Sequence, residues 1–251
     1  PSTSVMVNGT TADSTGNVEW VASTSELTAH WSRAIDAHTS VTYRWCIGTA
    51  AFGQQVLPWT NVGHRHTATA TGLQLLVGTR YYVTVQATNA AGLAVFANSA
   101  AVAVDTVPPT PGTVAVAVHM LRAGAVAAPY TDWLPCVWNG FEEGVSHIAG
   151  YRVGFGTTPG AADVVPFTHV DAHVRQYNAT GVSLVSGESY YCTVVGHDAA
   201  GNMAVTSSLG LAIDHSPPTV GRVLDIAPRA VFAGSSHAYG SDAVDVDHLP
   251  D

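Results

Sequence analysis

The sequence contains no lysine, so its nine Lys and Arg residues are all arginines, set against 18 acidic residues and a formal net charge of -9. So few cations leave no basic stripe that could follow a phosphate backbone or an anionic lipid surface. No run of about 18 uninterrupted apolar residues could cross a bilayer. The first residues, Pro1-Ser2-Thr3, have neither part of a signal peptide. We therefore expect no nucleic-acid partner and no direct membrane insertion.

Stretches with the period of a helix are also missing, and only 11% of the residues are charged, whereas 47% are hydrophobic. A hydrophobic share of this size excludes a disordered chain. The 24 glycines and 13 prolines are spread along the length, which suits many short strands joined by turns. The composition predicts an all-β protein.

The parts of a catalytic site are absent as well. There is no Gly-x-Ser-x-Gly, no Ser-x-x-Lys and no glycine-rich phosphate loop. Glu142 and Glu143 are adjacent, so they point apart in an extended chain and do not form an acid and base pair. We interpret them as a surface turn. The sequence predicts no enzyme and no cofactor.

An internal repeat is the strongest signal in the chain. Leu27-Thr-Ala-His-Trp31 matches Leu134-Pro-Cys-Val-Trp138 at an offset of 107, and Gly78-Thr-Arg-Tyr-Tyr82 matches Gly187-Glu-Ser-Tyr-Tyr191 at an offset of 109. A Pro-Pro pair closes each unit, at Pro108 and Pro217. Residues 1–107 and 108–216 therefore form two modules, and 217–251 begin a third that is incomplete. We expect the parent protein to continue beyond Asp251.

Alternating apolar residues in each unit predict strands with one buried face. Leu27, Ala29 and Trp31 share one parity, as do Tyr81, Val83, Val85 and Ala87. The second unit repeats this arrangement from Tyr190 to Gly196, and Asn89-Ala-Ala-Gly92 and Asp198-Ala-Ala-Gly201 supply hairpin turns. The predicted core anchors are Trp31, Trp138, Tyr81 and Tyr190.

The chain resembles the fibronectin type III family through the Trp of its second strand and a Leu-x-x-Gly-x-x-Tyr corner. The corner is Leu75, Gly78 and Tyr81 in the first unit, repeated as Leu184, Gly187 and Tyr190 in the second. Where the family often has Pro before that Gly, this chain has Val77 and Ser186. The resemblance implies tandem fibronectin type III-like, immunoglobulin-like β-sandwiches, a scaffold for adhesion, spacing or recognition.

Each repeat also contains a short motif, a Gly-Thr with another Gly shortly after and then Val-x-Pro-[Trp/Phe]-Thr. This motif resembles the sequences of large surface glycoproteins of flagellated green algae, including those of flagellar hairs. This implies a structural or adhesive segment at the cell surface, whose partners are other protein chains or further modules of the same chain. Two alternatives remain: non-catalytic accessory modules, a stalk or carbohydrate-binding region, of a secreted polysaccharide-degrading enzyme, and an intracellular filament or ciliary scaffold.

The parity argument brings two of the cysteines together. Cys136 stands where the first unit has Ala29, and Cys192 where it has Val83, so both sulfurs should enter one core from opposite sheets. Immunoglobulin domains place their bridge there, and Tyr190 precedes the second Cys by two residues, as in a tyrosine corner. We predict a disulfide; the alternative is two buried free thiols.

The third cysteine, Cys46, lies between Trp45 and Ile47 and should point away from the core. An outward thiol in an oxidising compartment can join another chain or module, and a partly covered free thiol is the alternative. Asn178-Ala-Thr180 and Asn8-Gly-Thr10 are acceptor sequences for an N-linked glycan, and parity turns Asn178 toward water.

Candidate metal ligands are present, but none is assigned. His64 and His66 share a strand face, with His169 and His173 in the matching region; neither pair has a third ligand, so we interpret them as solvated. Asp105 and Asp214, three residues before each Pro pair, could bind calcium between modules, and turn capping is the interpretation we prefer. The acidic run Asp242, Asp245, Asp247 and Asp251 lacks the Gly and Glu of an EF-hand. Leu224-Asp225-Ile226 resembles an integrin-recognition tripeptide that recurs by chance.

Overall fold

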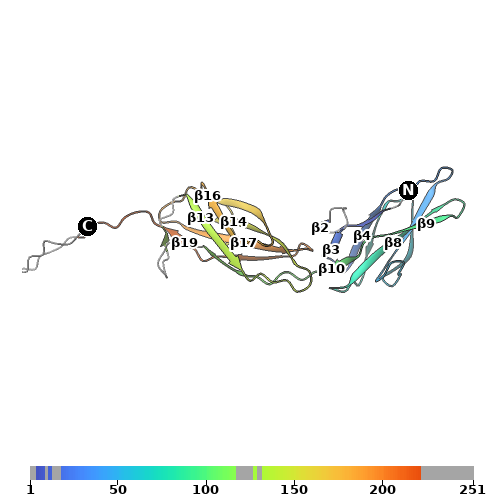
Figure 1. Ribbon diagram of the computed structural model, residues 1–251, viewed down its shortest axis with the longest axis horizontal. Helices are drawn as coiled ribbons and strands as arrows, with labels where there is room; N and C mark the ends of the chain where they lie inside the picture. Colours follow the sequence, from blue (N-terminus) through green and yellow to red (C-terminus); the bar gives the residue numbers. More distant parts are fainter. Residues whose placement is uncertain (1–3, 9–10, 13–17, 117–126, 129–131, 222–251) are drawn as a thin grey trace, which may run out of the picture. The chain divides into compact units, whose positions relative to one another are not determined.

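The computed structural model describes residues 4–8, 11–12, 18–116, 127–128 and 132–221. All regular elements in these residues are β-strands (Figure 1), and none of the described residues forms a helix able to cross a membrane. The chain divides into one compact unit, Pro1–Ser216, and a second unit, Pro217–Asp251. The beginning of the third module beyond 221, the Leu224-Asp225-Ile226 tripeptide and the acidic run after Ser241 fall outside the described residues.

The first half of the compact unit is a sandwich of two sheets (Figure 1). The smaller sheet has the order β1 (Val5–Val7), β4 (Glu26–Trp31), β7 (Thr67–Thr71). The larger sheet has the order β2 (Thr11–Ala12), β3 (Val18–Val21), β10 (Val102–Val104), β8 (Arg80–Asn89), β5 (Val41–Gly48), β6 (Leu57–Gly63), and β9 (Ala94–Asn98) also pairs with β8. Neighbouring strands are antiparallel except β3 and β10, which run parallel.

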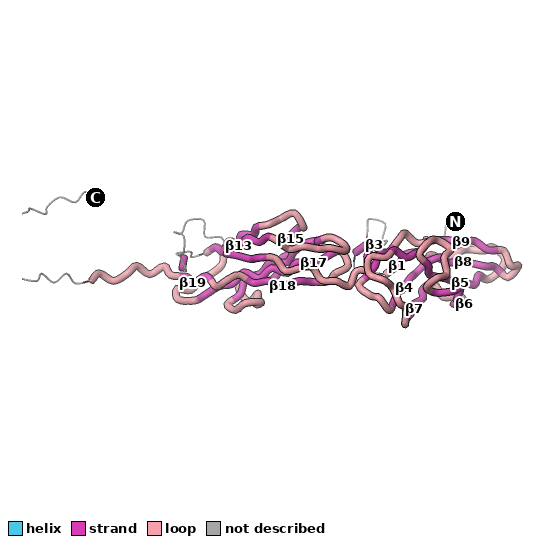
Figure 2. The backbone as a smooth tube through the Cα atoms, turned by 90° about the horizontal axis from the view of Figure 1, so that it is seen from below, coloured by secondary structure: helices cyan, strands magenta, loops and turns pink. Residues whose placement is uncertain are grey.

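The second half is a sandwich with the same strand order, except that the described residues contain no counterpart of β2. Figure 2 labels β13, β15, β17, β18 and β19 of this half. Its smaller sheet has the order β11 (Thr113–Val116), β13 (Trp133–Asn139), β16 (Gln176–Thr180). Its larger sheet has the order β12 (Ala127–Ala128), β19 (Leu211–Ile213), β17 (Ser189–Asp198), β14 (Ile148–Gly156), β15 (Val165–Asp171), and β18 (Met203–Ser207) pairs with β17. The only parallel pair described in this half is β12 with β19.

Each sandwich encloses one hydrophobic core, and the predicted anchors lie in it. Trp31, Tyr81, Trp138 and Tyr190 are all buried. The Trp31 ring lies 6.0 Å from that of Tyr43, and the Trp138 ring lies 5.5 Å from that of Tyr151. The inward residues predicted for β4 and β8 are buried, and β4 alternates as expected. In β8 the outward Thr84 and Gln86 are buried as well.

Both tyrosines also close the corner that the sequence motif predicts. The hydroxyl oxygen of Tyr81 accepts a hydrogen bond from the backbone N–H of Leu76 at 2.8 Å, and that of Tyr190 accepts one from Val185 at 2.9 Å. A buried hydroxyl needs such a partner, because an unpaired polar group in a core is costly. In each corner the glycine, Gly78 or Gly187, has a positive φ that side chains rarely adopt.

The predicted disulfide is present in the second core. Cys136 on β13 and Cys192 on β17 are bonded, with a Cα–Cα distance of 6.1 Å, and neither is exposed. The two strands belong to opposite sheets, so the bond joins the layers of the sandwich. Ala29 and Val83 occupy the matching positions of the first core, and both are buried.

The orientation predicted for Cys46 does not lead to exposure, and its place in the structure agrees with the alternative of a covered free thiol. The bond to another chain stays a prediction. Cys46 is a free cysteine with an exposed fraction of 0%. It pairs with Thr84 of β8, whose hydroxyl accepts a hydrogen bond from the backbone N–H of Phe52 at 2.9 Å. The loop after β5 thus folds back over the outer face of the sheet, and parity alone does not reveal this cover.

Candidate metal site

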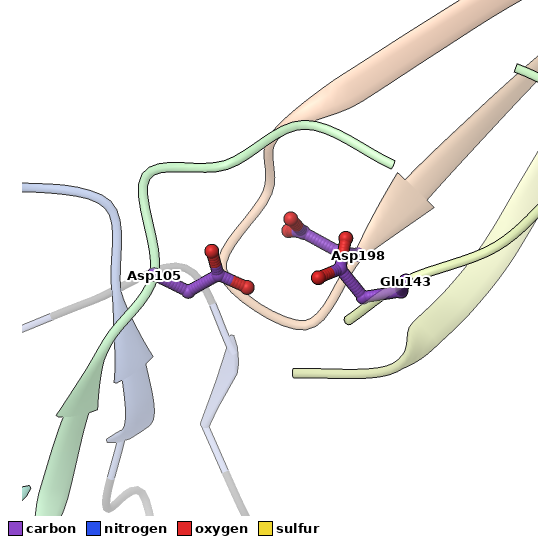
Figure 3. A group of neighbouring side chains, drawn as sticks. All are labelled: Asp105, Glu143 and Asp198. Carbon is purple, nitrogen blue, oxygen red and sulfur yellow. The ribbon is translucent and has the colours of Figure 1, made fainter. Parts of the chain in front are cut away.

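Three carboxylates meet where the chain enters the second sandwich (Figure 3). Asp105 directly follows β10, Glu143 lies in the loop between β13 and β14, and Asp198 is the last residue of β17. One oxygen from each lies within 4.8 Å of the other two. Figure 3 shows the carboxyl groups turned toward one another. Asp105 and Asp198 are buried, at 0% and 1% exposure, and Glu143 is half-buried.

The β17–β18 hairpin holds Asp198 in place. The backbone N–H of Asp198 donates to the carbonyl of Asn202 at 3.1 Å, and that of Gly201 donates to Asp198 at 3.2 Å. Gly201 supplies the positive φ of the turn. Both carboxylate oxygens of Asp198 accept hydrogen bonds from Asn202, one from its backbone N–H and one from Nδ2, each at 2.8 Å.

The same Asn202 side chain ties the segment after β10 to this hairpin. Its Nδ2 donates to the carbonyl oxygen of Asp105 at 3.0 Å. Further along the segment, Thr110 and Glu142 exchange two backbone hydrogen bonds, of 2.8 and 3.3 Å. These contacts fix Asp105 and Glu143 on either side of Asp198.

Two buried oxygens of the cluster have no hydrogen-bond partner. Oδ1 of Asp105 accepts from the backbone N–H of Val107 at 2.9 Å, and Oε1 of Glu143 accepts from that of Val145 at 2.8 Å. The other oxygen of each carboxylate, Oδ2 of Asp105 and Oε2 of Glu143, is buried and unpaired. Such atoms are exceptional in a folded protein, where buried polar groups are almost always bonded.

The first sandwich has the same loops with a different pair of residues. Asp36 precedes Glu143 by 107 positions (143 − 36), the offset that relates Trp31 to Trp138, and Asn89 matches Asp198 in the hairpin. Nδ2 of Asn89 donates to Oδ2 of Asp36 at 3.0 Å, while its Oδ1 accepts from the backbone N–H of Leu93 at 3.0 Å. In the second sandwich a carboxylate oxygen replaces that donor, so two carboxylates face each other.

The structure thus corrects two interpretations of the sequence. Turn capping is real for Asp105 and also for Asp214, which accepts a 3.0 Å hydrogen bond from the backbone N–H of Ser216. Asp214 is exposed, however, whereas Asp105 is buried and has a second oxygen left over. Glu142 is exposed, but Glu143 is not part of a simple surface turn. The sequence predicts Asp198 as part of a hairpin turn and not of a site. The only sign of the site in the sequence is that Asp198 stands where the first unit has Asn89.

The histidines within the described part of the chain do not form a site of this kind. His64 and His66 are exposed; the Nδ1 of His64 lies 2.7 Å from the carbonyl oxygen of Val41, and the His66 ring packs 5.1 Å from that of Tyr43. His173 is exposed, while the ring of His169 lies 5.5 Å from that of His197. Burial lowers the pKa of His197, and the positive charges of His169 and Arg152 lower it further. This last pair was not predicted.

The two glycan acceptors are placed differently. Asn178 is exposed on β16 between half-buried Tyr177 and buried Ala179, the alternation expected from parity. Asn8 is exposed just after β1, and the rest of its triplet is outside the described residues.

Neither a family model nor a curated protein matches this sequence. Among solved structures, the chain is similar to the fibronectin(III)-like modules of CbhA from Clostridium thermocellum, with a TM-score of 0.51 and 12% identity over 84% of this chain and 94% of that one. It is also similar to the FN1–FN3 domains of chicken CNTN1, with a TM-score of 0.44 and 16% identity over 82% of this chain and 67% of that one. The likeness to the CbhA modules shows the fold, two fibronectin type III-like β-sandwiches in tandem.

Proposed function

We propose that these two fibronectin type III-like modules are a structural or adhesive segment of an extracellular glycoprotein of the cell surface or of a filament, without catalysis. Modules of this kind are typically non-catalytic scaffolds. The observation that carries the proposal is the Cys136–Cys192 disulfide, because such bonds persist in oxidising compartments and are rare in the cytosol. The partners of the segment are other protein chains or further modules, and an N-linked glycan occupies Asn178.

More specifically, we propose that the segment lies on a flagellar surface. The repeated motif supports this, with Gly48-Thr49 and Gly53 in the first unit and Gly156-Thr157 and Gly160 in the second. In both loops the first glycine lies against backbone, since a Cβ atom on Gly48 would lie 2.4 Å from the backbone of Gly53 and one on Gly156 would lie 2.6 Å from that of Ala161. The loop that covers the outer sheet face needs glycine there.

The location can be tested with antibodies against the chain on intact and on permeabilised source cells. We expect labelling of intact cells to reach the level seen after permeabilisation, with a cytosolic protein as the negative control. Labelling that appears only after permeabilisation would reject the extracellular proposal and favour the intracellular scaffold.

One observation favours a second candidate, the accessory modules of a secreted polysaccharide-degrading enzyme. Phe52 and Phe96 are 52% and 49% exposed, and the ring of Phe96 lies 5.7 Å from that of Phe52 and 6.2 Å from that of Trp59. An exposed aromatic cluster marks a contact surface. Its planes are inclined by 65° and 62°, so the rings do not form one flat face for a sugar chain.

Co-sedimentation with insoluble cellulose, chitin and xylan distinguishes the two candidates. We expect the full chain to remain in the supernatant. Retention on one of these polysaccharides that is lost in Trp59→Ala would instead assign the segment to a depolymerase. Arg44, whose guanidinium carbon lies 4.8 Å from the centre of the Trp59 ring, keeps that side chain in place in the wild type.

A further inference from the structure

Two of the three clustered carboxylates, those of Asp105 and Glu143, each have one oxygen that is buried and without a hydrogen-bond donor. The third, that of Asp198, accepts two hydrogen bonds from the neutral Asn202. Uncompensated buried charge is strongly unfavourable, so such groups are paired or bind a cation. The first sandwich solves this at the matching position with the amide of Asn89. The second sandwich requires a different partner.

A cation is the partner that this arrangement fits. Three oxygens from different segments lie within 4.8 Å of one another. Ligands on opposite sides of a calcium ion are about 4.6 to 5.2 Å apart, given bonds of roughly 2.3 to 2.6 Å, so all three oxygens can reach one ion. The cluster offers oxygens only, whereas zinc prefers the nitrogen and sulfur ligands of His and Cys.

Calcium suits the cluster better than magnesium. Magnesium requires near-ideal octahedral geometry at about 2.0 to 2.1 Å and gives up its water reluctantly, while calcium accepts irregular carboxylate sites. Magnesium sites usually use one or two carboxylates and keep several waters, whereas this cluster offers three carboxylates. Water can complete the coordination on the side of half-buried Glu143.

We propose that Asp105, Glu143 and Asp198 bind one calcium ion, which holds the segment after β10 against the second sandwich. The proposal rests on two separate observations, the convergence of the carboxylates and the two buried oxygens without a donor. It does not depend on the proposed function. Calcium binding would stabilise the chain whether or not it stands outside the cell.

Calorimetric titration of the chelator-treated 251-residue chain with calcium chloride tests the proposal. We expect one site with a Kd of about 10⁻⁴ to 10⁻³ M, the range of extracellular calcium modules. Asp105→Asn and Asp198→Asn should each weaken binding at least about tenfold, because each removes a charged ligand. Asp214→Asn is the matched control, since Asp214 follows the second module as Asp105 follows the first, and it should leave the Kd unchanged.

Three outcomes of the titration would overturn the proposal. They are the absence of binding at 10 mM calcium (about ten times the weakest Kd expected), binding that survives both substitutions, and equal affinity for magnesium. Binding that survives would place calcium elsewhere, for example on the acidic run that ends at Asp251.

Thermal melting of the same proteins tests the proposal without a direct measurement of a weak Kd. Asp198→Asn removes a charge but also the hydrogen bond that Oδ2 accepts from Nδ2 of Asn202, so the melting temperature of each protein is compared with its own value in chelator. Millimolar calcium should raise the melting temperature of the wild type and leave that of Asp198→Asn unchanged. A wild-type melting temperature that calcium does not shift, or an Asp198→Asn melting temperature that calcium raises as much as that of the wild type, would contradict the proposal.

Discussion

At the residue scale, the matching hairpin turns of the two sandwiches differ by an amide in one, Asn89, and a carboxylate in the other, Asp198. Asn89 and Asp198 use the same oxygen, Oδ1, to accept a backbone N–H of the hairpin turn. They differ in the second side-chain atom, which donates to Asp36 in one sandwich and accepts a hydrogen bond from Nδ2 of Asn202 in the other. One turn can therefore carry a purely structural pair or a charged cluster.

The pKa of Asp36 reports on this pair. It is lowered from 3.8 to about 2, first by the side chain of Asn89 and then by the backbone N–H groups of His38 and Thr39. A depressed folded pKa contributes stability that is present above the unfolded value, about 3.9, and is lost as the pH falls toward 2. Asn89→Asp keeps the turn but removes the donor. We expect the Asp36 pKa to rise in an NMR titration; a pKa still near 2 would mean that the backbone bonds suffice.

Cys46 shows how a residue that faces away from the core can still be shielded. Burial raises the pKa of its thiol, although hydrogen bonds with Thr84 act in the opposite direction. We expect iodoacetamide at pH 8 to label the native chain at least about tenfold more slowly than the chain in urea. Without reductant the urea sample should gain one label, because Cys136 and Cys192 are bonded. Fast labelling of the native chain would show that the loop opens.

At the scale of elements, the sequence was informative wherever a strand has one buried face. The burial of Trp31 and Trp138 and the disulfide follow from parity within a repeat, whereas the two tyrosine corners follow from the resemblance to fibronectin type III modules. Parity fails where a loop returns over the outer face, because Cys46 and Thr84 are buried by neighbours from outside their own sheet. It also says nothing of distances between loops.

The disulfide gives the element scale its own prediction. The chemically matched variant is Cys136→Ala with Cys192→Val, which installs the residues of the first core. The bond closes a segment with a sequence separation of 56, and the chain-entropy model gives such a loop about 4 kcal/mol. We expect urea unfolding to lose that free energy in the transition of the second sandwich alone. An unchanged midpoint would show that the bond contributes nothing beyond packing.

At the scale of the whole molecule, the repeat predicted two sandwiches, and its matched segments fall on β4 and β13 and on the beginnings of β8 and β17. The carboxylate cluster could not be predicted in the same way, because Asp105, Glu143 and Asp198 come from three distant segments that only the folded chain brings together. Comparing the two units residue by residue would have shown the change from Asn89 to Asp198, but not the arrival of Asp105. The fold follows from the residues that the two units share, and the carboxylate cluster includes residues in which they differ.

The central claim is that the chain is a structural segment that matures outside the cytosol, and the mass of the native protein tests it most directly. The native chain should be measured before and after N-glycosidase, and after alkylation with and without reduction. We predict a glycan on Asn178, which is exposed on β16, and two cysteines that alkylate only after reduction. An unmodified Asn178 together with free thiols at Cys136 and Cys192 would contradict the account.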